Sequence, residues 1–194
     1  MTVINKEFLL KLNPNNDSIR RYIDELEDYS YTPLEFLDSK DFNDNFKVEV
    51  ITGQNDILTD DELKKFALDC ASRVIEECEE DTIREFFTIS LLADNYINTD
   101  ESETFLKKRV YWDICRDSWK LAMERSCNTL QKKYFNVVMS CFDSIPRQAA
   151  YLTSLDAAVA KSRFDINSLN VDGNKFLSER SIQVEMLKNI IKNK

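Results

Sequence analysis

Two groups of side chains in this sequence commonly take part in chemistry: five cysteines, and an acidic run that extends from Glu76 to Asp81. No two cysteines form a CxxC pair, and the closest two are separated by about two helical turns. This spacing does not supply the paired ligands of a Cys-only zinc site. Because each cysteine falls at an apolar position of a helical pattern, we expect a reduced and unreactive set packed in the core: Cys70, Cys78, Cys115, Cys127 and Cys141.

The acidic run places like charges four positions apart, which slightly destabilises a helix: Glu76 with Glu80, and Glu77 with Asp81. It has three interpretations, namely a solvated helix end, part of a surface that contacts a partner, or a site for a divalent cation. Magnesium sites normally include substrate phosphates, and the sequence shows no means of holding them. We therefore rank metal binding last among the three.

Histidine is absent from the sequence, and this absence excludes several classes of enzyme. It removes Ser-His-Asp and Cys-His nucleophilic systems, together with the zinc and di-iron sites that contain histidine. Glycine occurs only at Gly53 and Gly173, so the clustered glycines of nucleotide-binding loops are missing as well. We expect a non-enzymatic protein that needs no cofactor and no metal.

The excess negative charge lies entirely in the first third of the chain. Residues 1–62 carry 15 Asp and Glu against 6 Lys and Arg, a net charge of −9, whereas residues 63–194 carry 20 of each. This imbalance either keeps the protein soluble or attracts a basic partner, and it disfavours nucleic acid, which needs a basic surface. If a partner binds, the expected contacts are Asp24, Glu25, Asp28, Glu35, Asp38, Asp41 and Asp44, with Glu76, Glu77 and Glu80 as a second patch.

No signal peptide or transmembrane run is evident, because residues 1–11 are too short and too charged for either. With an odd number of unpaired cysteines, this absence indicates a reducing cytoplasm. We therefore expect a cytoplasmic protein that does not engage a membrane.

The elements that must position these residues are helices. Apolar residues recur at helical spacing from Thr59 onward, and so few glycines and prolines argue against a multi-stranded fold. We expect a single globular all-α domain of about six to eight helices, built around a long central block from Thr104 to Phe164 that contains Trp112 and Trp119. Residues 59–194 form this domain, and residues 1–58 form a small acidic helical appendage that packs on it.

Helix boundaries are marked by capping signals. Thr32-Pro33-Leu34-Glu35 and Thr59-Asp60-Asp61-Glu62 each read as a capped helix start, the first helix ending around Ser39 and the second around Glu79. Asp81 opens the next helix, and a final helix begins near Lys175 or Ser178. Residues 46–51 alternate like a strand, but because a lone strand has no partner we expect a helical turn or an irregular segment there.

Four pieces of the sequence, spanning about residues 60–190, resemble the all-helical immunity-protein family of bacterial polymorphic toxin systems. Leu68–Ile75 resembles that family's A-D-C-A-x-R-V-L helix, and Asp81–Phe86 follows an acidic turn as it does in the family. Ala149–Lys161 is similar to its Ala-rich helix, and Glu179–Leu187 to its closing E-R-x-W-Q-x-x-x-L segment.

The resemblance implies a protein that binds and neutralises a cognate toxin by occlusion, without catalysis. An acidic first third would speed association with a basic toxin. The alternative is a helical adaptor or regulatory protein, borne by a phage or plasmid, that binds another protein; an exposed apolar groove would favour it. The sequence predicts no oligomeric state.

Overall fold

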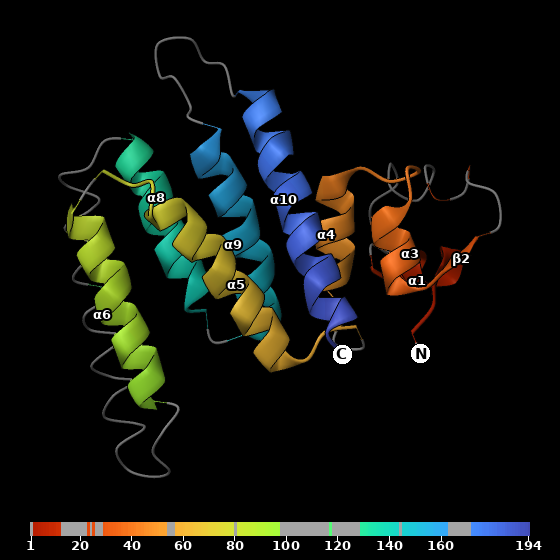
Figure 1. Ribbon diagram of the computed structural model, residues 1–194, viewed down its shortest axis with the longest axis horizontal. Coiled ribbons are helices and arrows are strands. Elements are labelled where there is room, and N and C mark those ends of the chain that lie inside the picture. The colour runs from red at the N-terminus through yellow and green to blue at the C-terminus, as the bar shows by residue number, and fades with distance from the viewer. Residues whose placement is uncertain are drawn as a thin grey trace.

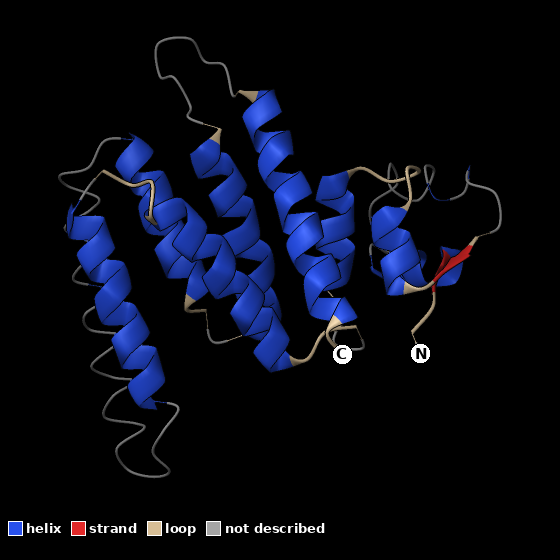
Figure 2. Cartoon of the chain, in the orientation of Figure 1, coloured by secondary structure: helices blue, strands red, loops and turns tan. Residues whose placement is uncertain are grey.

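The computed structural model describes residues 2–12, 23, 25, 29–53, 57–79, 81–97, 117, 129–143, 145–162 and 172–194 (Figure 1). Within these residues the chain forms eight helices and one two-stranded sheet. The all-α fold class is therefore confirmed, and Figure 2 shows how small the sheet is beside the helices. No helix in the described part of the chain is long and apolar enough to cross a membrane.

The small sheet joins the start of the chain to the segment just before helix α3 (Pro33–Asp38). Strands β1 (Ile4–Asn5) and β2 (Ser30–Tyr31) are antiparallel, with Ile4 opposite Tyr31 and Asn5 opposite Ser30. Asn5 also accepts a hydrogen bond from the backbone N–H of Phe8 at 2.9 Å, at the start of α1 (Lys6–Leu12). The sequence analysis did not predict these two strands, because each is only two residues long.

The capping signals at Thr32 and Thr59 are both confirmed. Thr32 caps α3 (Pro33–Asp38) and Thr59 caps α5 (Asp60–Ile75). In each case the threonine side chain accepts a hydrogen bond from the backbone N–H of the glutamate three residues later. The side chain of that glutamate in turn accepts a hydrogen bond from the backbone N–H of the threonine. For Thr59 and Glu62 the two distances are 3.3 and 2.7 Å. Helix α5 nevertheless ends at Ile75 rather than near Glu79, which places part of the acidic run in the turn before α6 (Asp81–Ile97).

Residues 46–51 form neither a strand nor an irregular segment. They lie within α4 (Asp44–Thr52), whose start is capped by the Asn43 side chain accepting from the N–H of Phe46 at 2.9 Å. Six of the nine residues of α4 are buried, including Lys47 and Thr52. A helix covered on most of its sides loses the 3.6-residue alternation of apolar and polar residues, and this explains why the pattern resembled a strand.

Helix α9 (Pro146–Lys161) lies at the centre of the packing. Helices α5, α8 (Thr129–Cys141), α10 (Gly173–Lys192) and α4 all contact it. Its buried residues are mostly small, among them Ala149, Ala150, Ala157 and Ala158. Small side chains let several neighbouring helices approach one axis, as expected for this run.

The remaining elements extend the molecule in two directions from α9. Helix α6 lies at one end, where Phe86 stacks on Phe135 of α8 with ring centroids 5.3 Å apart (Figure 1). Helices α1 and α3 lie at the opposite end. Because α3 and α4 contact α10, the last helix joins the N-terminal elements to α9.

The structure bears on two further predictions, the central block from Thr104 to Phe164 and the start of the last helix. Of the expected central block, residues 129–143 and 145–162 contain α8 and α9, whereas Trp112 and Trp119 lie outside the described residues. The last helix begins at Gly173, before either predicted start, because Asp172 caps it by accepting from the N–H of Lys175 at 3.2 Å. The domain boundary at residues 58 and 59 stays a prediction.

Candidate functional site

A buried polar network at the junction of α4, α5, α9 and α10 is built around Arg180. The Arg180 side chain is fully buried, although arginine rarely is. Its Nε and Nη2 atoms donate to the side-chain oxygen of Asn45 at 2.9 and 2.7 Å. Its Nη1 atom donates to Ser154 at 3.0 Å and to Gln183 at 2.8 Å. Four hydrogen bonds thus satisfy most of the five N–H groups that a guanidinium carries.

Glu179 extends this network toward α5. Its carboxylate is buried and lies 3.5 Å from the guanidinium of Arg73 and 3.5 Å from the amide nitrogen of Gln183. Gln183 also donates to the carbonyl oxygen of Ser154 at 2.9 Å. The three polar residues Glu179, Arg180 and Gln183 therefore bind both α5 and α9 from one face of α10.

The electrostatics of the network are those of a buried structural cluster. Burial lowers the pKa of Arg180 below its usual value, and nearby groups, including the carboxylates of Glu49 and Glu179, offset part of this shift. Burial raises the pKa of the Cys70 thiol well above its usual value, so Cys70 stays protonated at neutral pH. Among the described residues no group of three or more Cys, Asp or Glu is arranged to hold a metal ion.

The predicted acidic contacts on α3 and α4 are largely engaged within the protein. Glu35 closes the capping box of α3, and Asp41 accepts from the Tyr31 hydroxyl at 2.7 Å and from the Ser39 hydroxyl at 2.9 Å. Asp44 accepts from the hydroxyl of Ser181 at 2.5 Å. Hydrogen bonds from Tyr31 and Ser39 hold the pKa of Asp41 below its usual value. These carboxylates are therefore less available to a partner than their sequence positions indicate.

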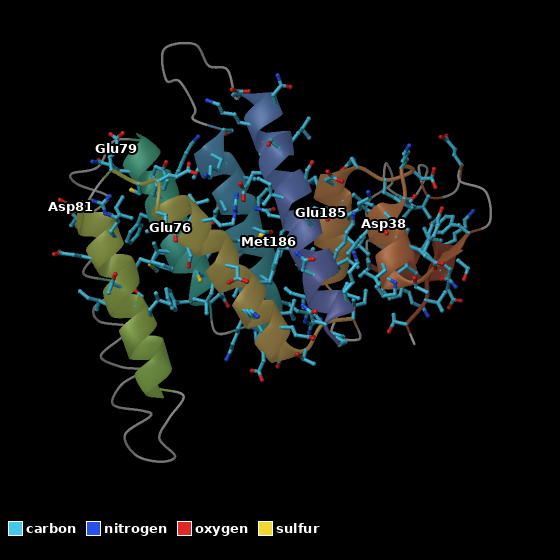
Figure 3. All side chains as sticks on the ribbon, in the orientation of Figure 1. Asp38, Glu76, Glu79, Asp81, Glu185 and Met186 are labelled. Carbon is cyan, nitrogen blue, oxygen red and sulfur yellow. The ribbon has the colours of Figure 1, made fainter. Side chains whose placement is uncertain are left out.

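Lys188 of α10 brings an additional positive charge to this end of the molecule. Its ammonium lies 2.7 Å from Asp38 and 2.6 Å from Glu185, while both carboxylate side chains remain 64% exposed. Burial acts to lower the pKa of Lys188, but its hydrogen bonds with these two carboxylates raise it overall. Figure 3 shows Asp38 and Glu185 on the facing helices α3 and α10.

The second predicted patch lies in the turn between α5 and α6, far from Asp38 (Figure 3). Glu77 forms an ion pair with Lys161 of α9, and Asp81 forms one with Arg84. Glu76 and Glu79 are exposed, and neither side chain forms an ion pair or a hydrogen bond with the described residues. Both carboxylates are therefore exposed without a counterion among the described residues.

Seven of the ten predicted contact residues are described, and those of the first predicted patch lie apart from those of the second. Asp24, Asp28 and Glu80 lie outside the described residues, and Glu25 is exposed. Residues 35–44 and residues 76–77 lie toward opposite ends of the molecule (Figure 1). The prediction omitted Glu79, although it belongs to the same acidic run, and Glu185, whose proximity to Asp38 depends on the packing of α10 on α3.

No protein-family model matches this chain, and neither a curated protein nor a solved structure matches it.

Proposed function

We propose that this protein is a non-enzymatic immunity protein that binds a basic protein toxin and neutralises it by occlusion. The observation that carries the proposal is the pair of exposed, unengaged carboxylates Glu76 and Glu79 in the turn between α5 and α6. A surface whose carboxylates outnumber its cations attracts a basic partner at long range and speeds its association.

The surroundings of this turn reinforce its negative charge. Residues 76–85 contain three further described carboxylates, Glu77, Asp81 and Glu85, and one cation, Arg84. Arg84 is engaged locally, because it also donates to the carbonyl oxygen of Cys78 at 2.6 Å. Lys161 is the one cation that an ion pair brings to the described turn from another element. With five carboxylates against these two cations, the turn keeps a net negative charge.

The framework behind the turn suits a protein that acts by binding. Helix α5 packs along α9, and α6 packs on α8 through Phe86 and Phe135, so the turn joins two anchored helices. An inhibitor that blocks a toxin by occlusion needs such a fixed surface and no catalytic group, since preorganised contacts lose little entropy on binding.

The alternative, a helical adaptor with an apolar groove, is favoured by no specific observation. The exposed large apolar residues of the described chain are Val3, Ile89, Ile145, Leu152 and Leu177, and they are spread over several elements. Single exposed apolar residues are ordinary on protein surfaces. The described surface therefore gives no support to the adaptor.

Co-expression with the product of the adjacent gene tests the proposed function. If that product is a toxin, the wild-type protein should restore growth of the host cells and should purify with it as a one-to-one complex. An adaptor would bind the same product without changing viability. Cells that die equally with and without this protein would overturn the immunity proposal.

A further inference from the structure

The contact between α4 and α10 has an inner and an outer hydrogen-bonded pair on adjacent residues. In the outer pair, the exposed hydroxyl of Ser181 donates to Asp44 at 2.5 Å. In the inner pair, Arg180 donates twice to the side-chain oxygen of Asn45, and its guanidinium is fully buried. The two pairs join the same helices, but only the inner one includes a fully buried side chain, that of Arg180, while its acceptor Asn45 is half-buried.

The packing of α4 on α10, which we call docking, depends on one hydrogen-bond acceptor, the side-chain oxygen of Asn45. When α4 is docked, Arg180 can satisfy its Nε and Nη2 groups only through Asn45 among the described residues. If α4 moves away, water replaces Asn45 at those donors. Loss of the Asn45 oxygen therefore raises the free energy of the docked state and leaves that of the undocked state almost unchanged.

An aromatic cluster connects helix α3 to α4. Phe36 of α3 packs on Phe42 and on Phe46 of α4, with ring centroids 4.8 and 6.4 Å apart, and Phe42 packs on Phe46 at 5.8 Å. Helices α5, α8 and α9 pack on one another through a separate set of side chains that includes the alanines of α9. Helix α4 also contacts α9, so undocking moves this aromatic cluster away from both α9 and α10, while α5, α8 and α9 keep their packing on one another.

We propose that Asn45 and Arg180 form a conformational latch. Its opening releases α3 and α4 from α10 as one unit, while α5, α8 and α9 remain folded. This inference does not depend on the proposed function. In this proposal Arg180 controls a local opening of the molecule, in addition to stabilising the folded chain.

Hydrogen–deuterium exchange of the full chain, read by mass spectrometry of its peptides, tests the latch. In Asn45→Ala, amides of residues 33–52 should exchange about tenfold faster or more, as expected when a buried charged donor loses its acceptor. Amides of α5 and α9 should stay within about twofold of the wild type. Alanine has the higher helix propensity, so the substitution cannot speed exchange by weakening α4 itself.

Two variants separate the acceptor from other effects. Asn45→Asp keeps an oxygen for Arg180 and should retain the slow exchange of α4, and Ser181→Ala removes only the exposed outer pair and should leave it unchanged. The latch is overturned if Asn45→Ala leaves the exchange of α4 unchanged. It is equally overturned if α4, α5 and α9 accelerate together, because the opening would then be global.

Discussion

The ammonium of Lys188 lies 2.7 Å from the carboxylate of Asp38, 150 positions earlier in the chain. The last helix thus delivers a cation to the acidic first third of the sequence. Lys188 lies outside residues 1–62, so it is not counted in the net charge of −9 that this segment carries. The net charge of the segment therefore overstates the negative potential around α3.

Replacing Lys188 with glutamine should raise the pKa of Asp38. The hydrogen bond from Lys188 is the main cause that holds this pKa below its usual value in the folded protein. A lowered folded-state pKa stabilises the fold above the unfolded-state pKa, and this contribution disappears as pH falls through the folded-state pKa. An NMR titration of the Asp38 carboxyl carbon measures the shift, and an unchanged pKa in Lys188→Gln would contradict the pairing. Lys192→Gln, a more distant cation, is the control.

Arg180→Met should lower the free energy of unfolding by about 2–5 kcal/mol, because it removes the donor that serves the buried acceptors of Ser154 and Gln183 and the half-buried oxygen of Asn45. Urea denaturation followed by circular dichroism measures this loss. The matched control is Arg147→Met, at an exposed position of α9, which should change stability by no more than about 0.5 kcal/mol. A loss below 1 kcal/mol for Arg180→Met would mean that the network does not stabilise the fold.

Thr59→Ala should destabilise the protein by about 0.5–2 kcal/mol, since it removes the side-chain acceptor at the N-cap of α5. Thr59→Ser keeps the hydroxyl and should recover most of this stability. Both variants can be compared by the urea midpoint at constant m-value. If the alanine variant unfolds at the wild-type midpoint, the capping box at Thr59 and Glu62 contributes nothing measurable.

Cys70, Cys78 and Cys141 are buried, and all three should resist alkylation in the native protein. Only a thiolate reacts rapidly, and burial raises the pKa of Cys70 well above its usual value. Labelling with iodoacetamide at pH 8 and peptide mapping reads each cysteine separately. Reaction of Cys70 at the rate of a free cysteine, without denaturant, would contradict its burial.

Local signals in the sequence predicted the fold well. The starts of α3 and α5 were identified because a capping box joins residues only three positions apart, as at Thr59 and Glu62. Asp81 was predicted as a helix start and opens α6. Residues 46–51 were predicted only as a helical turn or an irregular segment, and the helical option is correct. Burial of α4 on most sides, including that of Lys47, removes the amphipathic pattern on which a firmer prediction depends.

The candidate site was less predictable, because its contacts are long-range. Asn45 and Arg180 are 135 positions apart, and no local pattern distinguishes a buried asparagine–arginine pair from two surface residues. Segment charge likewise gave no sign that Lys188 would pair with Asp38. By contrast, Glu76 and Glu77 could be placed together, since neighbours in an acidic run stay neighbours in a turn.

The central proposal is that the acidic turn between α5 and α6 is the surface that attracts a basic partner. Two double reversals separate this turn from the first third of the chain, Glu76→Lys with Glu79→Lys, and Glu7→Lys with Glu25→Lys. All four glutamates are exposed. Glu7 also forms an ion pair with Lys11, which is itself an exposed residue of the same helix. Each double reversal changes the formal net charge by the same amount, so a difference between them reports position.

The most direct measurement is the association rate with the product of the adjacent gene, by stopped-flow at about 0.05 and 0.5 M salt, where the screening length falls from roughly 14 Å to 4 Å. We predict that the wild type and the Glu7/Glu25 variant associate at similar rates that fall strongly with salt. The Glu76/Glu79 variant should associate about tenfold more slowly at low salt and depend little on salt. Association of the Glu76/Glu79 variant at the wild-type rate, with the wild-type salt dependence, would contradict the account.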